Sequence, residues 1–216
     1  MTEPIRTASQ HAFIALAPPD HAKNELARAL SPAYAAHPHL RWNRIEDWHI
    51  TLAFLGELPV PAVQRLRSPL ADLASTRPSL ELALVDGGHF DERVLWTGIE
   101  GDLDQLHELA EAVQARVRDC DVAFAEHPLR PHLTLARARR RDNASVTAAA
   151  ACLNGFAGRP WQTEHLHLVG STLRGHSGPR RYQDIDAWIL LTGPRHPDRK
   201  PLRAAERENQ DGSGPD

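Results

Sequence analysis

Residues 48–52 read Trp-His-Ile-Thr-Leu, and residues 131–135 repeat the pattern as Pro-His-Leu-Thr-Leu. In a β-strand, residues i and i+2 project from the same side. His49 would therefore share one face with Thr51, and His132 would share one face with Thr134. The aliphatic residues next to them would point into a core. We predict two strands, each of which buries one side and presents an imidazole and a hydroxyl on the other.

The composition is that of a globular protein without a strong charge bias. A chain of 216 residues suits one domain, or two small lobes with a shared core. The formal net charge of −3 gives no overall attraction to nucleic acid, so a polyanion would need a local basic patch. Two cysteines make no disulfide framework, and no stretch approaches the roughly 18 apolar residues of a membrane span. We expect a cytoplasmic protein with no membrane attachment.

The hydrophobic pattern predicts strands and helices in mixed order, with few connections long enough for parallel crossovers. We therefore expect an α+β fold with antiparallel sheets. Residues 1–10 are expected to be a flexible leader, 11–193 a single domain, and the charged, Pro- and Gly-rich residues 194–216 a disordered tail. Pro69 should kink or split a helix that starts near residue 59. Predicted strands cover residues 11–17, 49–55, 80–85, 94–99, 122–124, 132–136, 164–169 and 182–191.

Two imidazoles on facing strands suit chemistry at a phosphodiester. An in-line displacement at phosphorus needs a base on the attacking side and an acid on the leaving side. Because the unperturbed pKa of histidine is about 6.5, one ring can be neutral while the other is charged. The threonine hydroxyls can donate to the non-bridging phosphate oxygens, where negative charge builds up. A mechanism of this kind requires neither a metal nor another cofactor.

These motifs resemble those of the 2H phosphoesterase superfamily, and within it the RNA 2′,3′-cyclic phosphodiesterase group, also called 2′-5′ RNA ligase-like proteins. The resemblance implies a bilobal fold of two antiparallel sheets flanked by helices, with pseudo-twofold symmetry around a central cleft. It rests on five stretches of the chain, at residues 13–16, 48–57, 94–96, 131–137 and 171–173 with 178–182.

The resemblance also implies an activity and a role for each motif residue. The protein would open the 2′,3′-cyclic phosphate at an RNA end to a 2′-phosphate, and related 2′-5′ ligation would run this chemistry in reverse. His49 would be the proton donor and His132 the proton acceptor, while Thr51 and Thr134 bind the phosphate. The expected partners are RNA ends, including tRNA fragments, or a cyclic nucleotide. We expect a monomer.

Other residues are weaker candidates for RNA contacts. Arg139 and Arg174 could belong to a basic rim beside the cleft. Trp48 and Tyr182 could stack on a base, although packing in the core is the more ordinary role for such aromatic residues.

A second interpretation concerns a possible zinc site. His165, His167 and His176 could together offer three ligands. No cysteine or carboxylate accompanies them at a useful spacing, so we expect His165 and His167 on the solvent side of a sheet. Two other functions stay open at this point. One is a non-catalytic module that binds RNA ends, and the other is a 2H phosphodiesterase acting on 2′-5′ oligonucleotides or small cyclic phosphates.

Overall fold

The computed structural model describes residues 9–138, 143–173 and 180–192. The strands are β1 (Ser9–Leu16), β2 (Arg41–Trp42), β3 (Ile50–Pro59), β4 (Glu81–Phe90), β5 (Val94–Gly101), β6 (His132–Arg137), β7 (Trp161–Gln162), β8 (His165–Leu173) and β9 (Arg180–Ile189). The helices are α1 (Asp20–Ala29), α2 (Ser31–Ala36), α3 (Val60–Ala74), α4 (Leu103–Asp119) and α5 (Asn143–Ala151), and a 3₁₀ turn, η1 (Ile45–Asp47), precedes β3. The α+β class is confirmed.

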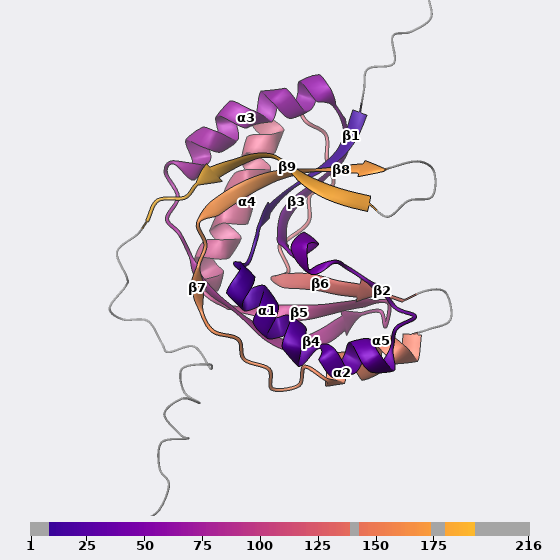
Figure 1. Ribbon diagram of the computed structural model, residues 1–216. Coiled ribbons are helices and arrows are strands. Elements are labelled where there is room, and N and C mark those ends of the chain that lie inside the picture. Colours follow the sequence, from indigo (N-terminus) through magenta and orange to yellow (C-terminus); the bar gives the residue numbers. More distant parts are fainter. Residues whose placement is uncertain (1–8, 139–142, 174–179, 193–216) are drawn as a thin grey trace, which may run out of the picture.

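The strands form one strongly curved antiparallel sheet (Figure 1). Its order is β7-β4-β5-β6-β3-β1-β8-β9, and β2 pairs with β6 beside this path. The prediction of two sheets is wrong in this respect. The two halves, with four strands on each side, are joined where Ile50 of β3 pairs with Leu133 of β6. The sheet resembles half of a barrel, and the two histidine motifs lie on the strands that meet at its middle.

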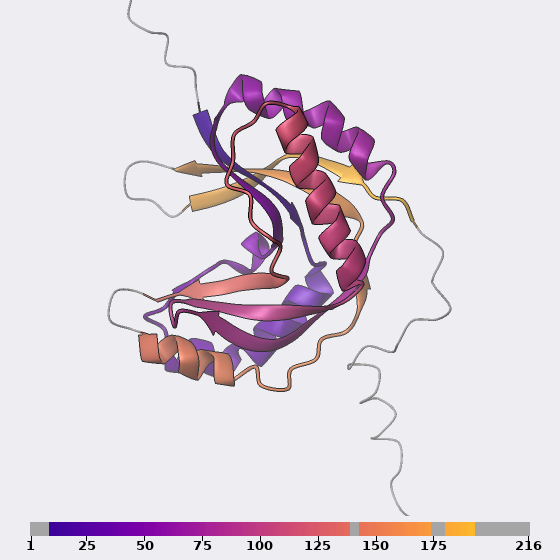
Figure 2. The same cartoon turned by 180° about the vertical axis from the view of Figure 1, so that it is seen from behind.

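The helices cover the outer side of the curved sheet (Figures 1 and 2). The helices α3 and α4 pack against the half that contains β1, β3 and β9, whereas α1, α2 and α5 lie over the half that contains β4 and β5. Pro69 does not split α3, which runs continuously from Val60 to Ala74. Leu66 and Leu70, on either side of the proline, are fully buried, and this packing holds the helix together.

Several predicted boundaries differ from the structure. The first strand begins at Ser9, inside the predicted leader, because residues 9–12 pair with the end of β3. No strand forms at residues 122–124. This segment opens an irregular loop, whose carbonyl at His127 accepts a hydrogen bond from the Gln114 side chain on α4. The predicted tail, residues 194–216, lies outside the described residues.

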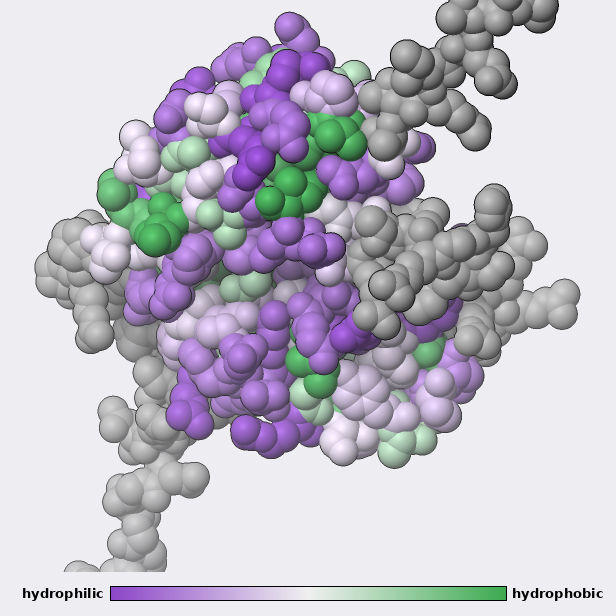
Figure 3. Space-filling view, turned by 45° about the horizontal axis from the view of Figure 1, so that its top comes forward, coloured by the Kyte–Doolittle hydropathy of each residue, from purple (hydrophilic) through white to green (hydrophobic). Residues whose placement is uncertain are grey.

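The surface seen in Figure 3 is largely hydrophilic, and hydrophobic residues appear there as small separate patches. Among the described residues, the large apolar side chains with substantial exposure are Phe54, Val60, Ile189 and Leu191. No helix in this part of the chain is long and apolar enough to cross a membrane. Phe54 stands out within this group because it lies five residues after His49, at the edge of the site.

Candidate active site

The pairing of β3 with β6 brings the two motifs together. Ile50 and Leu133 are opposite each other, and both are buried, at 1% and 0% exposure. Their side chains point into the core beneath the sheet. Because side chains alternate along a strand, the flanking His and Thr residues of each motif face the concave side, where they are partly exposed. The predicted sharing of faces is confirmed.

Each histidine is oriented by the backbone two residues before it. Nδ1 of His49 donates to the carbonyl oxygen of Asp47 at 2.6 Å, and Nδ1 of His132 donates to the carbonyl oxygen of Arg130 at 2.6 Å. A carbonyl only accepts, so Nδ1 carries the hydrogen in both rings. Nε2 is then the nitrogen of each ring that can contact a substrate. When neutral it accepts a proton, and when charged it donates one.

Aromatic rings hold both imidazoles in place. Phe13 of β1 stacks on His49 with ring centroids 4.4 Å apart, and Tyr182 of β9 meets the same imidazole edge-on at 5.6 Å. Phe90 of β4 meets His132 edge-on at 4.9 Å. Sequence reasoning missed Phe13 as a site residue. The available signal was its position on β1, which flanks a motif strand in the sheet, and this is a tertiary property.

Burial lowers the pKa of both catalytic candidates. For His49 the pKa falls to about 4, mainly because the ring is desolvated, with smaller effects from the positive charges of Lys23 and His132. The hydrogen bond to Asp47 opposes this shift. The pKa of His132 is also lowered, first by burial and then by the charges of Arg137 and Arg130. Both rings are therefore held towards the neutral form in the free protein.

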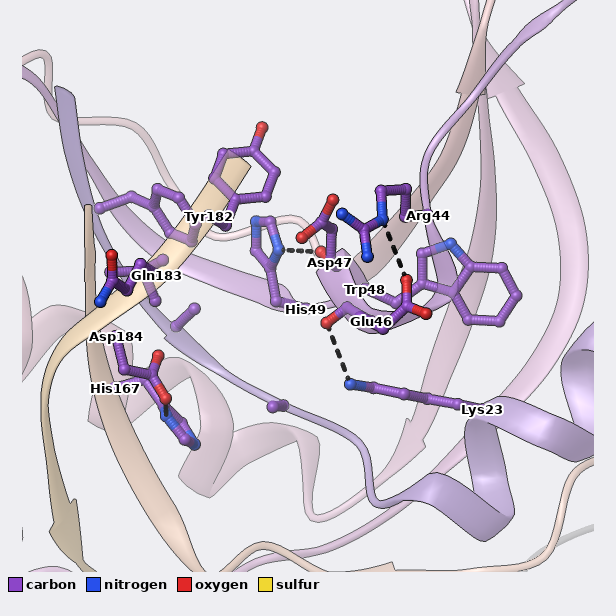
Figure 4. A pocket seen from close by; sticks show the side chains of 14 residues that line it. Lys23, Arg44, Glu46, Asp47, Trp48, His49, His167, Tyr182, Gln183 and Asp184 are labelled. Atoms are coloured by element: carbon purple, nitrogen blue, oxygen red, sulfur yellow. Dashed lines mark hydrogen bonds and ion pairs between the residues drawn. The ribbon is translucent and has the colours of Figure 1, made fainter. Parts of the chain in front are cut away.

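Two cavities flank the motif residues. The first, the His49 cavity, has a volume of about 430 Å³ (Figure 4). It is lined by Phe13, Ala15, Ala17, Lys23, Arg44, Glu46, Asp47, Trp48, His49, His167, Val169, Tyr182, Gln183 and Asp184. The second, the His132 cavity, has a volume of about 470 Å³ and is lined by Thr51, Leu52, Ala53, Phe54, Gln114, Phe124, Ala125, His127, Pro128, Leu129, Arg130 and His132. Each cavity contains one of the two histidines.

The structure places the weaker candidates for RNA contacts in different environments. Tyr182 lines the His49 cavity beside the imidazole, so its ring is placed at the site. The stacking role predicted for Trp48 is wrong, because its side chain is only 1% exposed and packs in the main hydrophobic core. Arg139 and Arg174 lie outside the described residues.

His165 and His167 lie on the same, partly exposed side of β8, opposite the fully buried Leu166, as the sequence predicts. His167 faces the His49 cavity, where its Nδ1 lies 3.1 Å from a carboxylate oxygen of Asp184 on β9. The reason is the register of the sheet, which sets His167 opposite Ala15 of β1, on the concave side. His176 lies outside the described residues. Within the described part of the chain, no three His, Cys, Asp or Glu side chains are grouped so as to hold a metal ion.

A curved antiparallel sheet with two His-x-Thr strands at its centre is the arrangement of a two-histidine phosphoesterase. The sequence model of the LigT-like phosphoesterases matches residues 16–96 and 99–178. The chain belongs to this family.

Relatives and solved structures agree with this assignment. The chain is 33% identical over 131 residues to an RNA 2′,3′-cyclic phosphodiesterase of Geobacillus stearothermophilus, covering 59% of this chain and 41% of the relative. It is 29% identical over 114 residues to an enzyme of the same name from Aeropyrum pernix, covering 50% and 64%. The matched stretch thus spans less than two thirds of either relative.

The fold matches E. coli LigT, crystallised with 3′-AMP, with a TM-score of 0.67 and 22% identity, covering 86% of this chain and all of LigT. The protein TT0787 of Thermus thermophilus matches with a TM-score of 0.66 and 23% identity, covering 86% of this chain and all of that protein. These likenesses show that the fold is that of LigT.

Proposed function

We propose that this protein hydrolyses the terminal 2′,3′-cyclic phosphate of RNA to a 2′-phosphate without a metal ion. The observation that carries the proposal is the pair of imidazoles at the middle of the sheet, each with Nδ1 bonded to the backbone and Nε2 left for the substrate. One ring on each side of a phosphorus atom is the arrangement that an in-line displacement requires.

In the proposed reaction, Nε2 of His132 takes a proton from water, whose oxygen attacks phosphorus. The bond between phosphorus and O3′ breaks, and His49 gives its proton to O3′. The phosphate stays on O2′. Thr51 and Thr134 donate hydrogen bonds to the non-bridging oxygens as negative charge grows on them. Exchange with solvent then removes the proton from His132 and returns one to His49.

The relatives support the choice of substrate. The matched enzymes of G. stearothermophilus and A. pernix are both described as RNA 2′,3′-cyclic phosphodiesterases. E. coli LigT was crystallised with 3′-AMP, a ribonucleotide that carries its phosphate on one of the two oxygens involved. An RNA end, or a cyclic nucleotide that imitates one, is accordingly the proposed substrate. Ligation of 2′-5′ linked RNA is the same displacement with a ribose hydroxyl in place of water.

The test is an assay on a short RNA that ends in a 2′,3′-cyclic phosphate, with and without a chelator. We expect the uptake of one water molecule and a 2′-phosphate in the product, identified by phosphorus NMR, at the same rate in both arms. Variants His49→Ala and His132→Ala should each lose about 10²–10⁴-fold in kcat. Loss of activity with the chelator would refute the metal-independent mechanism. Binding of the RNA without turnover would instead indicate a recognition module.

A further inference from the structure

The His49 cavity is larger than the proposed chemistry requires. The reaction at phosphorus uses two histidines and two threonines, yet the cavity extends past His49 across β1, β8 and β9 (Figure 4). Its volume of about 430 Å³ lies within the roughly 300–1,000 Å³ typical of ligand sites. Ala15 and Ala17 form part of its floor, and their small side chains keep it open. The cavity therefore has room for a group beyond the reacting phosphate.

Lys23, a residue with little exposure, lines the inner wall of this cavity. Lys23 is only 8% exposed, although its Nζ carries three hydrogen-bond donors. Its one hydrogen bond to a described residue is long, at 3.4 Å, and goes to the carbonyl oxygen of Glu46. Burying a charged donor is costly unless acceptors surround it. Acceptor oxygens from a bound molecule would satisfy this group.

The opposite wall offers hydrogen-bonding groups that are already held in position. His167 has its Nδ1 next to the carboxylate of Asp184 at 3.1 Å, which directs its Nε2 elsewhere. No described residue hydrogen-bonds to that Nε2. Gln183, the neighbour of Asp184 on β9, also lines the cavity and adds an amide. This wall can both donate to and accept from a polar ligand.

The charges around the cavity argue against a second phosphate as its main occupant. Lys23 and Arg44 supply two permanent positive charges, and Glu46, Asp47 and Asp184 supply three negative ones. Arg44 is moreover 3.2 Å from the carboxylate of Glu46. A polar but uncharged group fits this balance, and the sugar hydroxyls and base edge of a nucleoside are such a group.

The His132 cavity has a different character. Phe54, Phe124 and Leu129 give it apolar walls, and Arg130 also lines it. Flat apolar surfaces with an arginine suit the face of a nucleobase. Suppose that the cyclic phosphate of the terminal nucleotide lies between the two histidines. The base of that nucleotide could then occupy the His132 cavity, and the 5′ side of its ribose would face the His49 cavity.

We propose that the His49 cavity is a subsite for the nucleoside that precedes the terminal nucleotide of the substrate. The preferred substrate is then an RNA of at least two nucleotides and not a cyclic mononucleotide. Lys23, His167 and Gln183 are the residues that recognise the sugar and base of the preceding nucleoside. This inference rests on the proposed function, because it assigns the substrate of the same site.

The test compares kcat/KM for adenosine 2′,3′-cyclic phosphate with that for ApA carrying the same cyclic end. We expect the wild-type protein to prefer the dinucleotide by at least tenfold. His167→Ala and Lys23→Met should each reduce this preference at least fivefold. His165→Ala is the matched control. It lies two residues before His167 on β8 with its ring 5.9 Å away, but it does not line the cavity, so the preference should be unchanged.

Folding is checked separately by the melting temperature and by titrating each variant with ApA that ends in a 2′-phosphate. Weaker binding of this product by a folded His167→Ala protein supports the subsite. A wild-type enzyme that hydrolyses both substrates equally well overturns the inference and leaves the proposed function intact. Equal losses on both substrates in the His167 and Lys23 variants also overturn it. If neither substrate is hydrolysed, the proposed function itself fails.

Discussion

Ile50 lies directly opposite Leu133 in the antiparallel pairing of β3 with β6. Continuing this register by one residue in each direction sets His49 across from Thr134, and Thr51 across from His132. Residues that face each other in such a pair have Cβ atoms about 4.5–5.5 Å apart. On this register, each imidazole lies beside the hydroxyl of the other motif.

Loss of either threonine hydroxyl should slow the reaction without unfolding the protein. In Thr51→Val and Thr134→Val we expect kcat to fall about 10²-fold, because one donor to the developing charge on phosphate is gone. The isosteric change keeps the strand packed. Thr→Ser at either position retains the hydroxyl and should keep most of the activity. Steady-state kinetics on a cyclic-phosphate RNA check this, and valine variants as active as wild type would contradict it.

The roles of the two histidines can be separated with a leaving group that needs no proton. p-Nitrophenolate leaves as an anion, so a p-nitrophenyl phosphodiester requires the base but not the acid. If His49 is the acid, His49→Ala should retain most of its activity on this substrate, whereas His132→Ala should remain about 10²-fold impaired or worse. The opposite pattern would exchange the two roles.

The reason for separating the two roles is the lowered pKa of His49. Burial lowers the pKa of His49 to about 4, so its ring is neutral at pH 7 before substrate binds. For His49 to act as the acid, the bound phosphate must raise its pKa, which a nearby negative charge does.

The dependence of kcat/KM on pH should follow from the same pKa shifts. The productive form carries one proton on the pair, and both free-enzyme pKa values lie below the usual value of about 6.5. We expect kcat/KM to be highest on the acid side of pH 6.5 and to fall about tenfold per pH unit well above it, as the remaining proton is lost. A profile that still rises between pH 7 and pH 8 would be inconsistent with a shared proton.

The stability of the fold should also depend on His49. Its pKa is about 4 in the folded protein and about 6.5 in an unfolded chain, so the unfolded chain binds more protons between these values. The free energy of unfolding should therefore decrease as the pH falls from 7 to 5, by about 2 kcal/mol from this residue. Urea denaturation at both pH values measures the decrease.

His49→Gln provides the control for this measurement. Glutamine does not titrate, so the variant should lose less stability than wild type over the same pH range. Identical pH dependence in the two proteins would mean that His49 is not held neutral by the fold. The readout is stability alone, so the comparison does not depend on the activity of the variant.

The face on which each motif residue lies can be predicted from the sequence, because this property is local. His49 and Thr51 share a face through strand alternation alone, and so do His132 and Thr134. The partners of these residues come from strands distant in the sequence. Phe13, Lys23 and His167 reach the site only through the pairing of β1 with β3 and β8 and the packing of α1. Nothing in their immediate neighbours indicates that contact.

The difference between local strand alternation and contacts from distant strands also explains which predictions were wrong. Trp48 is next to His49 in sequence, but alternation sends its ring to the opposite face, into the core. The prediction of two sheets failed because Ile50 and Leu133, which join the halves, look like ordinary core residues in the sequence. The shared face of each His and Thr could thus be predicted from sequence, whereas the curvature of the sheet and the cavities beside it could not.

The hydrogen bonds at Nδ1 determine which amino-acid substitutions this site can tolerate. In many enzymes a carboxylate side chain orients the histidine, and replacing that one residue disables the site. Here the acceptors are the main-chain carbonyl oxygens of Asp47 and Arg130, which every amino acid supplies. Substitutions at positions 47 and 130 can therefore alter charge around the phosphate while both imidazoles keep their direction. The direction of both imidazoles is set by the path of the backbone, and the side chains at positions 47 and 130 can vary without changing it.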